Sequence, residues 1–326
     1  RLLPKPTPSG SRRRGEASTW FLDAARLLAL SADPDEAAQE ALEGSTSGLG
    51  GVIGAALSRT GPLDTLLVGI SRSAVHDGGL GAMDALGGLR VAKDLLSRRS
   101  LGLVLADDIA LGGMNGAGAA LTSITSISPE LAQELDRRAC SRAMEVVSAA
   151  QDLDPGAVGP RRSLPVVSAL DDVGPSAAEH APNSAGNARL SASSWGTGVG
   201  GGSALVLRAL GAWVRPGARA MAEILALSDA VRGQDLVVAA WGELYDVLAD
   251  GVVGVVGQQT ASQALPCIVV CGRCAVSRGE LAAAGVTTAY GLQEAHATEP
   301  WDATDSHRLE SRLTDLGTRL ARTWSR

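Results

Sequence analysis

Short apolar runs recur along the chain, and between them apolar residues return every three or four positions. An apolar run of about four to eight residues is typical of a buried strand, whereas the wider spacing is typical of an amphipathic helix. The runs lie at Leu66–Ile70, Leu101–Ala106, Leu236–Ala240, Ile268–Cys271 and Val286–Tyr290. Because helical stretches alternate with them, most clearly in the C-terminal third, the pattern predicts an α/β fold with parallel strands covered by helices.

Signals for the start of a helix are clearest at two places. Ser128 can serve as the N-cap of a helix that begins at Pro129 and runs to about Ala150. Ser277 and Glu280 have the spacing of a capping box, so another helix is expected directly after Ser277. Apolar spacing predicts further helices at residues 20–28, 37–42, 80–86 and 309–324, and a short strand at residues 164–170.

The stretch from Leu66 to Leu86 organises the interpretation of function. The predicted strand Leu66–Ile70 leads into the turn Asp77-Gly78-Gly79, and a helix follows from Leu80. Unpaired N–H groups at such a turn, together with the helix dipole, can hold an anion. Asp77 can also serve simply as the N-cap of the helix, in which case the turn binds nothing. On the pattern alone, the capping role is favoured.

Composition and charge exclude several classes of protein. The chain has 326 residues, 45% of them hydrophobic, and its 29 basic and 35 acidic residues give a net charge of −6. This balance predicts no large basic surface for nucleic acid or an anionic membrane. No apolar run approaches the roughly 18 residues that span a bilayer.

Residues 1–19, which include Arg12–Arg14, are predicted to be a disordered arm. Lys5 and Lys93 are the only lysines, so arginine carries nearly all the positive charge.

The four cysteines do not have the spacing of a metal site. Cys271 and Cys274 form a single Cys-x-x-Cys, and neither a second such pair nor a paired histidine motif accompanies it in the sequence. We therefore expect no bound metal ion at these residues and free thiols in a reducing, cytoplasmic environment.

Several segments, in order along the chain, resemble the motifs of one known family. Gly69–Gly81 resembles the signature Gly-[Ile/Leu]-Gly-Gly-Ser-Ala-Thr-Asn-Asp-Gly-Gly-x-Gly of the type-1 glycerate kinases. Gly196, Gly198 and Gly201 also satisfy Gly-x-Gly-x-x-Gly, which alone would indicate an NAD-type oxidoreductase, but no clear strand precedes them. The other similar segments are Ser45–Leu57, Asp107–Ala117, Gly196–Gly217, Leu265–Gly272 and Ala284–Tyr290.

The resemblance implies a fold of two α/β domains. One is a Rossmann-like or flavodoxin-like domain with a parallel sheet, and the other is inserted into it. In this chain, residues 20–44 and 233–326 would form the first domain, and residues 45–232, which carry the Asp-Gly-Gly turn, would form the inserted one. Ligands would bind in the cleft between the two domains.

The resemblance also implies a chemistry, the transfer of a phosphoryl group from ATP, with Mg²⁺, to glycerate or a similar small hydroxy acid. Asp77 and Asp107 would be the catalytic carboxylates. Asp107 follows the strand Leu101–Ala106, where a carboxylate can bind Mg²⁺ or orient a hydroxyl group, or can cap the next turn. Nothing in the sequence specifies an oligomeric state. The residues implied to bind substrate or phosphate are Ser73, His76, Gly78, Gly79, Asn115, Gly196, Gly198, Gly200, Gly201, Gly242 and Glu243.

The chain departs from the family pattern within the motifs themselves. Ser71 and Arg72 stand where the family has two glycines, and His76 replaces an asparagine. Arg72 either supplies positive charge to the site or fills it with a long side chain. Without gaps, Ala239–Gly242 occupies the family's Thr-Gly-Glu-Gly, whereas a shifted register with compensating gaps would place Gly242, Glu243 and Asp246 in that motif. Both family lysines are absent. Two functions follow: an active glycerate-kinase-like enzyme, or a catalytically silent relative that binds a metabolite, nucleotide or protein partner.

Overall fold

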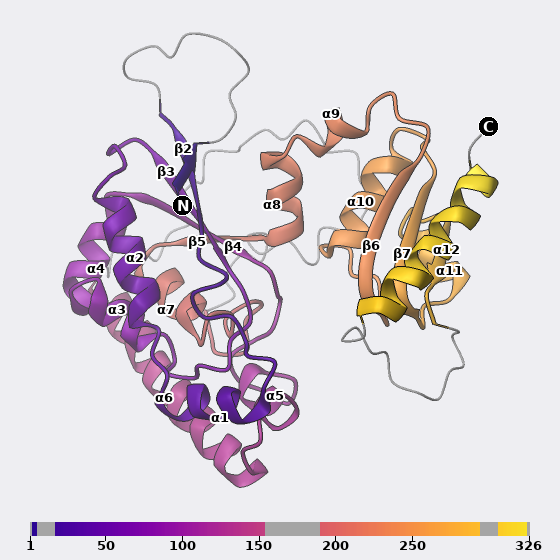
Figure 1. Cartoon of the computed structure of the whole chain (residues 1–326). Coiled ribbons are helices and arrows are strands. Elements are labelled where there is room, and N and C mark those ends of the chain that lie inside the picture. The colour runs from indigo at the N-terminus through magenta and orange to yellow at the C-terminus, as the bar shows by residue number, and fades with distance from the viewer. Residues whose placement is uncertain (1, 5–16, 154–189, 294–305, 325–326) are drawn as a thin grey trace. The chain divides into compact units, whose positions relative to one another are not determined.

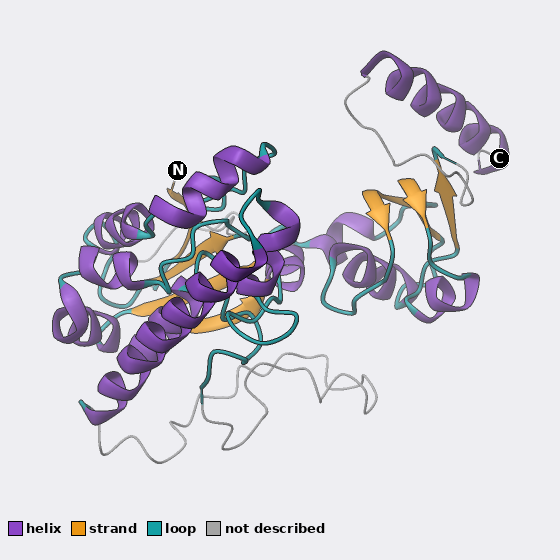
Figure 2. Ribbon diagram, turned by 90° about the horizontal axis from the view of Figure 1, so that it is seen from below, coloured by secondary structure: helices purple, strands orange, loops and turns teal. Residues whose placement is uncertain are grey.

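The computed structural model describes residues 2–4, 17–153, 190–293 and 306–324. The chain forms two compact units, Arg1–Pro216 and Gly217–Arg326, and each is described by itself (Figure 1). Each unit contains a sheet with parallel strands, and helices pack around the strands (Figure 2). The predicted α/β class is therefore confirmed.

Five strands form the sheet of the first unit. In their order across the sheet they are β1 (Leu2–Pro4), β2 (Thr19–Asp23), β3 (Thr65–Ile70), β4 (Ser100–Leu105) and β5 (Trp213–Pro216). Strand β1 pairs antiparallel with β2, and all other neighbours are parallel. The predicted apolar runs form β3 and β4, whose residues are buried on both faces, as is usual for parallel strands.

Helices pack against the first sheet and build the main core. Helices α2 (Ser47–Leu57), α4 (Gly88–Ser97) and α7 (Ser203–Leu210) contact β3, β4 and β5, respectively, and α3 (Leu80–Ala85) contacts all three of these helices. Alternate residues of the strands, such as Val68 and Leu103, are fully buried in this core. Consecutive right-handed crossovers place such helices on the same face of a sheet.

The long helix α6 (Pro129–Asp152) begins and ends close to the predicted residues. The Ser128 hydroxyl accepts the Leu131 N–H group, so Ser128 is the N-cap, as the sequence indicated. Its N-terminal part packs with α1 (Pro34–Glu43) and α5 (Ala117–Ile124) around a small separate core. This packing matters for function because α5 and the start of α6 line the hollow described below.

The second unit contains a three-stranded parallel sheet with the order β6 (Val237–Leu244), β7 (Cys267–Cys274) and β8 (Thr288–Gly291). The predicted capping box is present, since Ser277 and Glu280 exchange both hydrogen bonds. The Trp324 indole N–H donates to the Tyr290 hydroxyl at 3.2 Å, so the C-terminal helix is tied to β8. The helices are α8 (Gly217–Ile224), α9 (Leu227–Val231), α10 (Val252–Ala261), α11 (Arg278–Ala283) and α12 (Ser306–Trp324).

The structure differs from the sequence predictions most at the start of the chain. Residues 20–28 were expected to begin a helix, but Trp20 to Asp23 belong to β2 and pair with Leu66 to Gly69 of β3. These residues lie in the first unit, so residues 20–44 do not join the C-terminal third as the expected domain division had it. These residues form a strand because pairing with β3 buries their apolar side chains, which an isolated helix would expose. The predicted disordered arm is wrong where it is described, since Leu2–Pro4 form β1 and Thr19 begins β2. Residues 5–16 of the arm and residues 164–170 lie outside the described residues.

Candidate active site at the carboxyl edge of the first sheet

The carboxyl ends of β2, β3 and β4 meet at one edge of the first sheet, because these strands are parallel. The chain leaves this edge after Asp23, Ile70 and Leu105. The segment after Ile70 contains Ser71–Gly79, and the segment after Leu105 contains Asp107. Ligands of open α/β sheets commonly bind beyond this edge. The fold therefore brings several of the predicted site residues to a suitable place.

Asp77 lies at the centre of a hydrogen-bond network. Its carboxylate accepts the backbone N–H groups of Thr46 (2.8 Å), Gly79 (2.8 Å) and Gly81 (3.2 Å). The Thr46 hydroxyl donates to Oδ2 at 2.8 Å, and the Ser45 hydroxyl donates at 3.5 Å. Thr46 is the N-cap of α2 and Gly79 is the N-cap of α3, so Asp77 ties the starts of two helices together. The acceptor capacity of this carboxylate is met by the protein.

The two glycine-rich segments pack backbone against backbone. Gly78 and Gly79 have φ values of 72° and 79°, a region that favours glycine. A Cβ atom at Gly79 would lie 2.7 Å from the carbonyl oxygen of Gly202, and one at Gly201 would lie 2.7 Å from that of Val75. The absence of side chains at these positions therefore allows the two segments to touch.

The N–H groups of the second glycine-rich segment are used within the protein. Those of Gly196, Gly198 and Gly200 donate at 2.9, 2.9 and 3.0 Å to backbone carbonyl oxygens. The acceptors are, in the same order, Asp108, Ile109 and Ser71. A phosphate-binding cradle needs N–H groups that point to the ligand without partners of their own. This geometry fits a packing turn, and a phosphate-binding role for these glycines stays a prediction.

Arg72 and Asp107 form an ion pair across the edge between β3 and β4. The Arg72 Nε lies 2.8 Å from Asp107 Oδ2, with the two side chains 41% and 21% exposed. The Ile109 N–H group donates to Asp107 Oδ1 at 3.0 Å, so Asp107 also caps the turn that follows it. Arg72 therefore does not fill a closed pocket; its side chain lies partly exposed at the edge, where it supplies positive charge.

Ser73 and His76 are buried beneath this edge. The Ser73 hydroxyl accepts the Val75 N–H group at 3.2 Å. The His76 side chain is only 1% exposed, and its Nε2 lies 3.5 Å from Oδ1 of Asp136 on α6 without a hydrogen bond to any described residue. The Cys140 thiol donates to the same oxygen at 3.5 Å. Burial, and then the nearby Asp136 charge, raises the pKa of Cys140 to about 12, so this thiol is protonated and unreactive at neutral pH.

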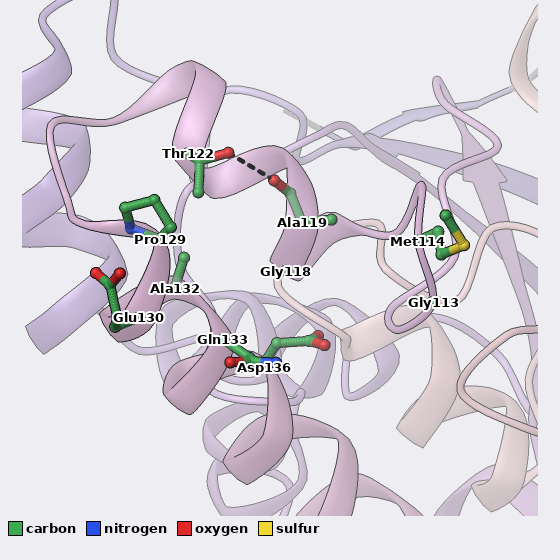
Figure 3. Close-up of a pocket in the computed structure, with 10 residues that line it drawn as sticks. All are labelled: Gly113, Met114, Gly118, Ala119, Thr122, Pro129, Glu130, Ala132, Gln133 and Asp136. Carbon is green, nitrogen blue, oxygen red and sulfur yellow. Dashed lines mark hydrogen bonds between the residues drawn. The ribbon is translucent and has the colours of Figure 1, made fainter.

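Asp136 also lines a hollow of about 540 Å³ between α5 and the start of α6 (Figure 3). Its carboxylate lies next to Gly118 (Figure 3), where a Cβ atom would overlap it. Asn115, a predicted binding residue, is exposed next to this hollow in the sequence. The charged lining residues are both acidic, so the hollow does not suit an anionic ligand. The lining comprises Gly113, Met114, Gly118, Ala119, Thr122, Pro129, Glu130, Ala132, Gln133 and Asp136.

The sequence did not indicate the partners that these site residues find. Asp136 meets His76 only because α6 folds back against the signature segment, and no spacing in the chain indicates that contact. Thr46 is the main partner of Asp77. The one signal for Thr46 in the sequence is that it belongs to the segment Ser45–Leu57, which resembles the family.

Gly242 and Glu243 belong to the second unit and are described within it alone. Both lie on β6, where Glu243 is opposite Arg273 of β7. A hydrogen bond with Glu243 raises the pKa of the exposed Tyr245 phenol, with smaller contributions from burial and from the Glu243 charge. The carboxylate of Glu243 is therefore engaged with its neighbours in this unit.

The four cysteines lie in both units of the structure. All four, including Cys271 and Cys274 on β7, are free thiols. Among residues that the structure describes, no group of three or more histidine, cysteine or acidic side chains is arranged to hold a metal ion. Helices long and apolar enough to cross a membrane are likewise absent from the described parts of the chain.

Fold and site together define an α/β protein with a glycine-rich signature segment at the carboxyl edge of a parallel sheet. A model of the glycerate kinase family matches residues 5–132 and 167–325, so the chain belongs to the glycerate kinase family.

Among solved structures, one match is a protein provisionally named glycerate kinase 2 from Salmonella typhimurium LT2. It is 18% identical over 99% of this chain and 84% of that one, with a TM-score of 0.52. This similarity shows the fold. The search of curated proteins gave no match.

Proposed function

We propose that this protein transfers a phosphoryl group from ATP to the hydroxyl group of glycerate or a similar small hydroxy acid. The observation that carries the proposal is the family match over residues 5–132 and 167–325, which includes the signature segment at the sheet edge. Phosphoryl transfer is catalysed mainly by positioning and by stabilisation of charge, with little covalent chemistry for the protein to perform. A site organised by fixed charges is therefore sufficient in principle.

The two carboxylates expected to be catalytic differ in how available they are. The Asp77 carboxylate accepts hydrogen bonds from five donor groups of the protein. The Asp107 carboxylate accepts from two, the Arg72 Nε and the Ile109 N–H group. Neither is a free base. Positive charge at the edge therefore has the main catalytic role, and Asp107 fixes that charge in place.

The fit to the implied cofactors is uneven. The Gly196–Gly202 turn does not fit the phosphates of ATP, because its N–H groups at Gly196, Gly198 and Gly200 already donate to carbonyl oxygens. No step is derived through that turn. Mg²⁺ is usually held by one or two carboxylates together with substrate phosphates, and it would neutralise charge on the transferred group. Asp108, which is exposed at the same edge, is the type of ligand that fits it.

A catalytically silent relative that binds a metabolite, nucleotide or protein partner is the second candidate. The saturated carboxylate of Asp77 favours it, because its oxygens already accept protein donors and are not free to accept a proton from a substrate hydroxyl group. Lys93 favours it too, since its Nζ donates to the Ala209 carbonyl oxygen at 3.1 Å and is thereby committed away from the edge.

The two candidates are separated by a phosphotransfer assay on the full chain. We expect ADP release that depends on D-glycerate in the presence of Mg²⁺ and ATP, with phosphoglycerate identified by ³¹P NMR. Titration calorimetry with Mg²⁺-ATP runs in parallel. Nucleotide binding without turnover on any small hydroxy acid would support the silent relative, and neither binding nor turnover would overturn the kinase proposal.

A further inference from the structure

The backbone that carries Arg72 is held on both sides. The carbonyl oxygen of Ser71 accepts the Gly200 N–H group at 3.0 Å. The Ser71 hydroxyl donates to the carbonyl oxygen of Ala25 at 2.9 Å, and its oxygen lies 3.4 Å from that of Arg72. The loop after β2, the signature segment and the Gly196–Gly202 turn are thus joined at one point. Arg72 projects from a fixed base rather than from a free loop.

The side chain of Arg72 is oriented through a single nitrogen. Its Nε donates to Asp107 Oδ2 at 2.8 Å, and the other oxygen of Asp107 is held by the Ile109 N–H group at 3.0 Å. Guanidinium has five N–H donors, and this bond uses one of them. The four donors on the terminal amino groups have no partner among the described residues. With 41% of the side chain exposed, they remain reachable from solvent.

We propose that the terminal amino groups of Arg72 bind an oxyanion at the carboxyl edge of the first sheet. The ligand is the carboxylate of the acceptor or a phosphoryl group, because the planar guanidinium fork matches either one with two parallel hydrogen bonds. The identity of that ligand rests on the proposed function, whereas the binding itself does not. Asp107 is a positioning residue, which holds Nε so that the fork faces outward.

The charges at the edge are consistent with a moderate affinity. Asp107 neutralises part of the Arg72 charge, and the carboxylates of Asp23 and Asp108 lie at the same edge. Arg26 is exposed directly after the Ala25 carbonyl group that holds Ser71, and it adds positive charge nearby. Because Asp107 already holds the guanidinium group, the Arg72 side chain loses little conformational entropy when a ligand binds, and this offsets the weak net field.

The test uses the full chain without nucleotide. D-Glycerate and inorganic phosphate are titrated separately by calorimetry into the wild type, Arg72→Met, Arg72→Lys and Asp107→Asn. Arg98→Met is the matched control, because Arg98 pairs with Asp94 on the surface of α4. We expect Arg72→Met to weaken binding at least roughly tenfold, as for a lost hydrogen bond to a charged group. Arg72→Lys and Asp107→Asn should fall between it and the wild type, and the control should not change.

Each outcome decides the proposal. Loss of glycerate binding assigns the fork to the carboxylate, and loss of phosphate binding assigns it to the phosphoryl group. Equal binding of both anions by wild type and Arg72→Met, with both folded by circular dichroism, overturns the inference, as does a wild type that binds neither. If binding depends on Arg72 but the protein has no kinase activity, the inference about Arg72 stands and the proposed function fails. If the protein is an active kinase and its Arg72→Met variant keeps both KM values, the proposed function stands and the inference about Arg72 is overturned.

Discussion

Asp77 and Asp107 lie at the same edge of one sheet, yet their surroundings differ sharply. Asp77 accepts three backbone N–H groups and the hydroxyl of Thr46. Asp107 accepts one backbone N–H group and a partly exposed arginine. The first carboxylate is committed to joining helices, whereas the second connects the scaffold to a charge that faces solvent. Two aspartates that follow strands in similar sequence contexts can therefore have very different partners.

The comparison explains how one part of a family signature can persist while another part changes. Asp77-Gly78-Gly79 is the intact part of the signature, and these residues make contacts that the fold requires. Arg72 is the altered part, and it introduces a guanidinium group where the family has glycine. The presence of Asp77-Gly78-Gly79 therefore says little about activity, whereas the change to Arg72 bears directly on ligand binding.

The largest effect is expected from Asp77→Ala. It leaves the N–H groups of Thr46, Gly79 and Gly81 without their acceptor, at a partly buried position. We expect the free energy of unfolding of the first unit to fall by about 3 kcal/mol, since each unsatisfied donor costs about 1 kcal/mol or more. Hydrogen exchange should become faster at the starts of α2 and α3, as measured by mass spectrometry.

Asp84→Ala is the control for this change, because Asp84 is exposed on α3 and its carboxylate has no partner among the described residues. The control should leave exchange and thermal unfolding unaltered. A fully stable Asp77→Ala protein that loses phosphotransfer activity would reverse the comparison, since Asp77 would then be catalytic rather than structural.

The next effect concerns contact between the two glycine-rich segments. Gly79 and Gly88 have φ values of 79° and 80°, so alanine carries the same backbone strain at both. A Cβ atom at Gly79 meets the Gly202 carbonyl oxygen, whereas at Gly88 nothing lies within 4 Å. We expect Gly88→Ala to cost about 1 kcal/mol, and Gly79→Ala about 2 kcal/mol more because of the overlap. Chemical denaturation of the two variants measures the difference.

Equal losses from the two substitutions would mean that the segments are not in contact in solution. In that case the glycines would again be open to a role in phosphate binding. A larger loss at Gly79, with inorganic phosphate giving no protection to the wild type against unfolding, would assign the segment to packing.

The sequence predicted the parts of the fold that depend on local pattern. The apolar runs of β3 and β4, the N-cap of α6 at Ser128 and the capping box at Ser277 all form as expected. Local pattern could not identify β2, because Trp20 to Asp23 become a strand through pairing with β3 and not through their own periodicity. Strand β5 was missed for a similar reason, since four residues at its position gain order from β4.

In the candidate site, too, the sequence indicated which residues are unusual but not what they contact. Glycine at positions 79 and 201 indicates that something approaches the backbone closely, but a phosphate group and another backbone leave the same mark in a sequence. In the folded protein that neighbour is backbone: the Gly202 carbonyl group for Gly79 and that of Val75 for Gly201. Likewise, Arg72 was visible as a substitution, whereas its pairing with Asp107 depends on two strands that are separated by α3 and α4 along the chain.

The smallest effect extends the comparison to a third carboxylate, Asp64, which resembles Asp77 in its donors. Asp64 accepts the N–H groups of Ser18 (2.8 Å) and Gly61 (2.8 Å) and the indole N–H of Trp20 (2.9 Å). The Ser18 bond is the main cause that lowers the pKa of Asp64 below its usual value, with burial opposing it. A lowered pKa in the folded state stabilises the protein above the unfolded pKa of about 3.8, and this contribution is lost as pH falls through the folded value.

Asp64→Asn should therefore flatten the acid limb of the stability curve below about pH 4. The effect is expected to be less than about 1 kcal/mol, because solvent screens a group that is not deeply buried. Urea unfolding monitored by tryptophan fluorescence between pH 2.5 and 6 measures it, with Asp84→Asn as the control. An unchanged acid limb in Asp64→Asn would show that hydrogen bonding by N–H groups does not suffice to commit a carboxylate to the fold, and the structural assignment of Asp77 would lose its closest parallel.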